Sequence, residues 1–89
     1  MAKKARPKKT PAMVLWSMID AERCAQKLSL RMLGEISGYS SGTVSLDANS
    51  PERIPLDRLF TYFAALGIDA ATVIRPVAEA FIDNLTRSA

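Results

Sequence analysis

The residues able to do chemistry are few in this chain, and their types point to binding. The 89 residues include no histidine and a single cysteine, Cys24. Zinc sites of the Cys/His kind and nucleophile pairs of the Cys/His or Ser/His kind are therefore excluded, and one cysteine cannot form an internal disulfide. We expect no enzyme activity, no metal and no cofactor. Cys24 lies in a helical stretch, where we expect a small buried hydrophobic side chain.

Basic side chains are concentrated at the N-terminus. Five of the 12 lysines and arginines fall within the first ten residues, which contain no acid: Lys3, Lys4, Arg6, Lys8 and Lys9. The rest of the chain is slightly acidic, although the formal net charge is +3. A charged run interrupted by Pro7 and Pro11 neither packs nor continues a helix, so residues 1–11 are predicted to be a disordered basic arm. We expect this arm to contact nucleic acid; the alternative is a tail that only increases solubility.

Length and composition predict one globular domain over residues 12–89. Apolar residues make up 48% of the chain and charged residues 24%, a balance typical of globular proteins. No apolar run approaches the roughly 20 residues that a membrane-spanning helix needs. No apolar stretch with a small-residue cleavage site follows the basic residues, so we expect no secretory signal and a cytoplasmic protein.

The first predicted helix covers residues 12–27, a stretch without glycine or proline. One apolar stripe has the spacing of three and four residues that is typical of a buried helical face: Val14, Met18, Ala21, Ala25 and Leu28. A second stripe lies beside it: Ala12, Leu15, Trp16 and Ile19. We expect either the terminal helix or a second subunit to cover the second stripe.

Two short helices with a sharp turn between them come next. Ser29 is the expected N-cap of the first, which ends at Gly38 because glycine readily adopts the left-handed conformation that terminates a helix. Its inward side chains are expected to be Leu33 and Ile36. Ser40 is the expected N-cap of the second, which extends to about Ala48.

Two further helices complete a predicted all-α fold of five helices. Pro55 opens the fourth helix and Gly67 ends it. Its buried face is expected to contain Leu56, Leu59, Phe60, Phe63 and Leu66. Asp69 caps a last segment in which Pro76 is expected to break the helix, leaving a short turn and then a helix from Pro76 to about Thr86. The apolar stripe of this segment contains Ile74, Val77 or Ala78, Phe81 and Leu85.

The pair of short helices is the strongest functional pattern in the sequence. Two short helices joined by a turn of about three residues that contains glycine are typical of the helix-turn-helix motif, whose second helix lies in the major groove of DNA. The segment from Ser29 to Ala48 has this spacing. Helical bundles that bind no DNA show the same pattern, so the alternative is a bundle without this function.

The order of residues resembles the lambda-repressor-like, or Cro/C1-type (XRE), helix-turn-helix family. The resemblance covers residues 28–45, 54–59 and 65–69, with a Leu-Ser start, a turn glycine, a Ser-x-x-Thr-Val-Ser recognition helix and a fourth helix that opens at proline and ends Leu-Gly-Ile. It implies a five-helix DNA-binding domain of that type. The sequence departs from the family at Leu30, where glutamine is usual and Arg31 is a possible substitute, and at Gly34, where the family has alanine and glycine still allows close packing. It departs again at Asp47 and Ala48.

The resemblance implies a set of DNA contacts. The residues expected to face the base edges are Ser41, Gly42, Ser45 and Leu46. Those expected to contact phosphates are Ser29, Arg31, Ser40, Thr43, Arg53 and Arg58. None of the base-facing side chains makes the bidentate contact of Arg to guanine or Gln to adenine, so we expect affinity from phosphates and selectivity from DNA shape or from the arm.

The expected function is that of a sequence-specific transcriptional regulator, a repressor or autoregulator of phage or plasmid type. It would bind a palindromic operator in double-stranded DNA as a homodimer and be associated with the nucleoid. The residues expected at the dimer interface are Trp16, Ile19, Phe81, Ile82 and Leu85. Two alternatives are an antitoxin bound by a cognate toxin or another regulatory protein, and a helical protein-interaction module that does not bind DNA.

Overall fold

The computed structural model describes residues 9–88 and contains no strand within them. Five α-helices and one short 3-10 turn follow one another: α1 (Pro11–Ala25), α2 (Leu30–Ser37), α3 (Ser41–Asn49), η1 (Pro51–Arg53), α4 (Leu56–Leu66) and α5 (Ala70–Ser88). The all-α prediction is confirmed. Of the predicted arm, Lys3, Lys4, Arg6 and Lys8 lie outside the described residues, and Lys9 is exposed.

Side-chain caps and left-handed glycines set the helix boundaries. The Ser29 hydroxyl accepts a hydrogen bond from the Met32 amide at 3.0 Å, and the Ser40 hydroxyl accepts one from the Thr43 amide at 3.2 Å. These bonds satisfy amides that have no partner within the first turn of a helix. Gly38 and Gly67 end α2 and α4 with φ angles of 84° and 77°. The predicted boundaries at these positions are confirmed.

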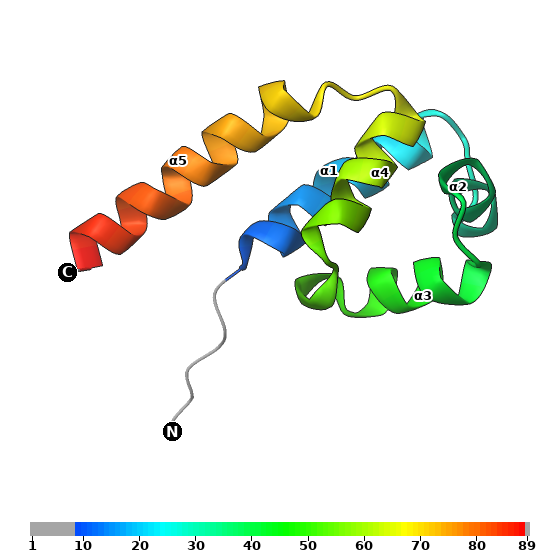
Figure 1. The fold of residues 1–89 in the computed structure, drawn as a ribbon, viewed down its shortest axis with the longest axis horizontal. Coiled ribbons are helices and arrows are strands. Elements are labelled where there is room, and N and C mark those ends of the chain that lie inside the picture. The colour runs from blue at the N-terminus through cyan, green and yellow to red at the C-terminus, as the bar shows by residue number, and fades with distance from the viewer. Residues whose placement is uncertain (1–8, 89) are drawn as a thin grey trace.

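The helices form a small bundle around α1 and α4 (Figure 1). These two helices pack against each other in the centre; α2 packs on α4 and α3, and α5 lies along α1 on the other side. All five α-helices contribute to one apolar core, together with Ile54, which directly follows η1. Its buried members are Leu15, Trp16, Ile19, Leu33, Val44, Ile54, Leu59, Tyr62, Phe63, Leu66 and Val77.

The face of α1 that is buried in the core contains the second predicted stripe, which includes Leu15, Trp16 and Ile19. Trp16 and Ile19 are only 7% and 0% exposed, whereas Ala21 and Ala25 on the first stripe are exposed. This side of α1 is covered within the same chain: Trp16 meets Tyr62 of α4 edge to face, and both α4 and α5 pack on α1. The stripe is buried without a second subunit, and α4, which neither expectation named, forms part of its cover.

The predicted break at Pro76 is wrong, because α5 is one continuous helix from Ala70 to Ser88. Proline cannot donate to the carbonyl four residues earlier, here that of Thr72, and this usually kinks or ends a helix. Thr72 lies at the surface, where water can satisfy the unpaired carbonyl. Val73 and Val77, on either side of Pro76, pack against the same core and hold both halves of α5 in line.

Three apolar side chains predicted to face inward lie elsewhere. The buried face of α4 is made by Leu59, Tyr62, Phe63 and Leu66. The buried face of α4 is thus turned around the helix axis relative to the predicted face. This leaves Leu56 and Phe60 on the outside, with Phe60 42% exposed. Ile36 is exposed as well, because α2 packs through Leu33 and Gly34. Cys24 is exposed rather than buried, because it lies on the side of α1 away from the core.

Candidate nucleic-acid interface

The turn between α2 and α3 consists of Gly38, Tyr39 and Ser40, and it brings the two helices very close together. The Gly34 carbonyl accepts hydrogen bonds from the Gly38 and Tyr39 amides, at 2.8 and 2.9 Å. A Cβ atom on Gly34 would lie 2.7 Å from the Tyr39 carbonyl oxygen and 3.2 Å from the Val44 side chain. The expected close packing at Gly34 is therefore confirmed, and at this spacing a Cβ atom at position 34 would clash.

One face of α3 is open to solvent and carries no charge. All four residues predicted to face the bases, Ser41, Gly42, Ser45 and Leu46, are exposed. Val44 points into the core on the opposite face. The only charged residue of α3, Asp47, is also on the inner side and is 3% exposed. The open face is therefore made of small polar side chains, a glycine and one leucine.

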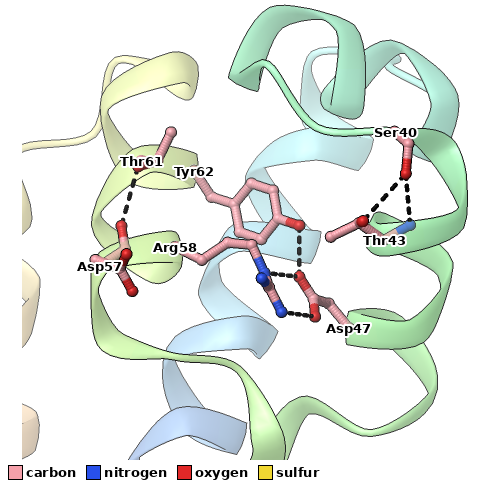
Figure 2. A network of polar contacts seen from close by, with 7 residues as sticks. All are labelled: Ser40, Thr43, Asp47, Asp57, Arg58, Thr61 and Tyr62. Atoms are coloured by element: carbon pink, nitrogen blue, oxygen red, sulfur yellow. Dashed lines mark hydrogen bonds and ion pairs between the residues drawn. The ribbon is translucent and has the colours of Figure 1, made fainter.

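Asp47 is held by α4 through three hydrogen bonds, shown in Figure 2. Its carboxylate accepts from Arg58 Nε at 2.7 Å and from Arg58 Nη2 at 2.9 Å. The Tyr62 hydroxyl donates to the same carboxylate at 2.6 Å. A buried carboxylate needs such partners, because removing its charge from water without them is very unfavourable. The bonds tie the C-terminal half of α3 to α4 and compensate the negative charge.

Aromatic rings surround this group. The Tyr62 ring meets Trp16 and Tyr39 edge to face, with centroids 5.7 and 5.6 Å apart. The Arg58 guanidinium lies over the Tyr39 ring, with its Cζ atom 5.6 Å from the centroid. Burial, followed by the bond to Asp47, raises the pKa of Tyr62 well above its ordinary value. The bond to Asp47 is also the main cause that raises the pKa of Arg58.

The sequence interpretation missed this pair of partners. Asp47 was recognised only as a departure from the family pattern, and Arg58 was assigned to phosphate contact. A carboxylate three residues after Val44, on the inner side of a short helix, should have suggested a buried charge that requires a cationic partner. In the structure, two of the three guanidinium nitrogens of Arg58 are bound to Asp47, so Arg58 is no longer a free phosphate ligand.

The other residues assigned to phosphates lie in two places, near the starts of α2 and α3 and beyond the C-terminal end of α3. Ser29 and Ser40 cap α2 and α3, and the Thr43 hydroxyl is 3.0 Å from that of Ser40. Arg31 is exposed, with its Nε atom 3.5 Å from Glu35. Arg53 is exposed on η1, beyond the C-terminal end of α3. It lines a hollow of about 220 Å³ with Leu46, Asp47, Ser50 and Arg58.

The residues predicted for a dimer interface are separated by the structure. Trp16 and Ile19 are buried in the core of their own chain and cannot contact a second subunit, which corrects that part of the prediction. Phe81 is partly buried, whereas Ile82 and Leu85 are 62% and 70% exposed. At the other end of α5, an open groove of about 540 Å³ is lined by Phe60, Ala70, Ala71, Ile74 and Arg75.

Comparisons with known proteins add no relatives: no family model matches the chain, and no curated protein or solved structure matches it either. Among residues 9–88, no helix is both long and apolar enough to cross a membrane. The same residues contain no cluster of three or more acidic, cysteine or histidine side chains that could hold a metal ion.

Proposed function

We propose that the protein is a sequence-specific DNA-binding transcriptional regulator, a repressor or autoregulator of phage or plasmid type with a lambda-repressor-like fold. The observation that carries this proposal is the character of the outward face of α3, the second helix of the α2–α3 pair. Its outward face is exposed and free of negative charge, and its single carboxylate is turned inward and compensated by Arg58. An uncompensated carboxylate on that face would repel the phosphates that flank the major groove.

The shape of the face supports the same proposal. The groove admits an α-helix, and small side chains such as those of Ser41, Gly42 and Ser45 allow the helix backbone to approach the bases closely. The Ser41 and Gly42 amides come before the capped Thr43 amide and have no acceptor within the helix, and such amides are natural ligands for a phosphate oxygen. Arg31 and Arg53 place a cation near each end of the α2–α3 pair. In this proposal the basic arm adds further phosphate contacts.

The proposed regulator is a homodimer that pairs through α5. The exposed Ile82 and Leu85 near one end of the helix and the apolar groove beside Phe60 near its other end are complementary surfaces on a single chain. A two-fold axis near the middle of α5 would bring the leucine and isoleucine of each copy to the groove of the other. A palindromic operator then presents one half-site to each subunit.

The proposal is tested by measuring binding to duplex DNA from upstream of the protein's own gene, using fluorescence anisotropy at several salt concentrations. We expect binding to that DNA at least tenfold tighter than to a scrambled duplex of equal length and composition. We also expect affinity to fall steeply as the salt concentration rises, because the protein's lysine and arginine side chains displace counterions from the phosphates. Equal affinity for the two duplexes would contradict sequence-specific regulation from this site.

A further inference from the structure

Leu46 is the one large apolar side chain on the open face of α3, and it is 69% exposed. It is not part of the helix packing, because Val44 and Ala48 supply the apolar contacts of α3 with the core. Its neighbours on the face are serines and a glycine, so it projects beyond them. No residue of the described chain covers it, and removing the side chain would open no cavity in the core.

The chemistry of the other side chains on this face leaves base selection to Leu46. A serine hydroxyl both donates and accepts, so Ser41 and Ser45 bond to any base edge, and Gly42 has no side chain. A leucine has no hydrogen-bonding group, and the one apolar group that a base pair presents in the major groove is the C5-methyl group of thymine. A 5-methylpyrimidine is therefore the partner that fits Leu46.

The place of Leu46 in the fold supports this assignment. It borders the hollow that is also lined by Asp47, Ser50, Arg53 and Arg58, of which Asp47 and Arg58 are bound to each other. Arg53 is exposed there, and a cation beside the groove binds the phosphate backbone rather than a base. Leu46 thus lies beside Arg53, and a phosphate contact of Arg53 would bring Leu46 close to the edges of the bases.

We infer that Leu46 is a specificity-determining residue that selects DNA sites by contact with the 5-methyl group of a thymine. This inference rests on the proposed function, in which α3 enters the major groove. It assigns the selectivity of α3 to an apolar contact, and it predicts that each half-site contains a thymine whose methyl group, rather than its hydrogen-bonding groups, is recognised.

The test begins with a duplex selected by the wild-type protein from a random-sequence pool. Each thymine of the site is then replaced in turn by deoxyuridine, which removes the methyl group and keeps the base pair. At one thymine per half-site we expect affinity to fall about fourfold, the factor that corresponds to burial of one methyl group. An unchanged affinity at every position would overturn the inference, while binding of the selected duplex itself would leave the proposed function standing.

Two leucine variants show which residue reads the methyl group. The Leu46→Ala protein should bind the thymine and deoxyuridine sites equally well. Its circular dichroism spectrum should match that of the wild type. The control is Leu56→Ala, which removes another exposed leucine, at the start of α4, and should keep the fourfold difference. A fourfold difference that persists in Leu46→Ala would also overturn the inference. If the wild-type protein selects no DNA from the pool, the proposed function itself fails.

Discussion

At the scale of single residues, the account depends on a carboxylate placed inside the molecule. Asp47 accepts three hydrogen bonds, from Arg58 and Tyr62, and these replace the water that an exposed carboxylate would keep. Hydrogen bonds to a charged group are worth about 1.5–3 kcal/mol each, more than those between neutral groups. The group therefore fixes α3 on α4 and keeps negative charge away from the open face.

Replacing Tyr62 by phenylalanine tests this group through pH. The pKa of Tyr62 is raised in the folded protein, so the folded state holds the phenolic proton more tightly than the unfolded state does. The stability that this raised pKa contributes to the free energy of unfolding is fully present below the unfolded pKa of about 10. It is lost as pH rises above that value. We expect Tyr62→Phe to be about 2 kcal/mol less stable than wild type at pH 8, as measured by urea unfolding. The difference should shrink above about pH 10; a constant difference across that range would contradict the assignment.

At the scale of the elements, local sequence predicted helix boundaries better than helix orientation. The caps at Ser29 and Ser40 and the stops at Gly38 and Gly67 were predictable because each acts on its own turn. Which face of α4 is buried depends on partners distant in sequence, so Tyr62 was missed and Phe60 was wrongly placed inside. The exposure of Ser41, Gly42, Ser45 and Leu46 was expected from the family resemblance. The Asp47–Arg58 pair joins two helices and leaves no local pattern.

Gly34 is the residue on which the close approach of α2 and α3 depends. We expect Gly34→Ala to destabilise the protein by about 1–3 kcal/mol, because the new methyl group would meet the Tyr39 carbonyl oxygen at 2.7 Å and force the helices apart. The matched control is Gly42→Ala, whose Cβ would meet only the Ser40 hydroxyl at 3.8 Å. This control should equal or exceed wild type in stability, because alanine favours a helix more than glycine does. Thermal unfolding of both variants checks the prediction; equal stability would show that α2 and α3 are less tightly packed than described.

We expect Pro76 to lower the stability of α5 without kinking or ending the helix. Replacing it by alanine restores an amide that can donate to the Thr72 carbonyl and removes the steric conflict of the ring with the preceding turn. We expect Pro76→Ala to be more stable by about 2 kcal/mol, a gain reduced slightly by the greater freedom of the unfolded chain. Denaturant unfolding measures the change. A loss of stability would mean that Pro76 is needed for the position of α5.

At the scale of the whole molecule, α5 determines how two copies could meet. Its inner side packs on α1 and α4, while Ile82 and Leu85 remain exposed near its end. Since Trp16 and Ile19 are already buried, the predicted interface residues left for pairing all lie on α5, which also borders the groove beside Phe60. Pairing there would have to set the two α3 helices about 34 Å apart, one turn of DNA, for both to reach a palindromic site.

The proposed dimer is tested by sedimentation of Leu85→Asp at micromolar concentration. We expect wild type to sediment as a dimer and the variant as a folded monomer, because a buried unpaired carboxylate at the interface would be strongly unfavourable. Leu85 is a better site for this change than Phe81, which is partly buried in its own subunit. The control is Ala80→Asp on another side of α5, which should remain dimeric. A wild-type protein that is monomeric under these conditions would contradict pairing through α5.

The most direct test of the central claim, that the open face of α3 contacts DNA, is a fluorescence anisotropy titration of the double variant Ser41→Glu/Ser45→Glu against the wild-type site. Both serines are exposed, so the fold and the unfolding temperature should be retained. The control, Ser17→Glu/Ala80→Glu, adds the same charge at exposed positions on α1 and α5. We predict at least a hundredfold loss of affinity for the α3 variant and less than tenfold for the control, because only the former places carboxylates against the groove. Equal affinities of the two variants would contradict the claim.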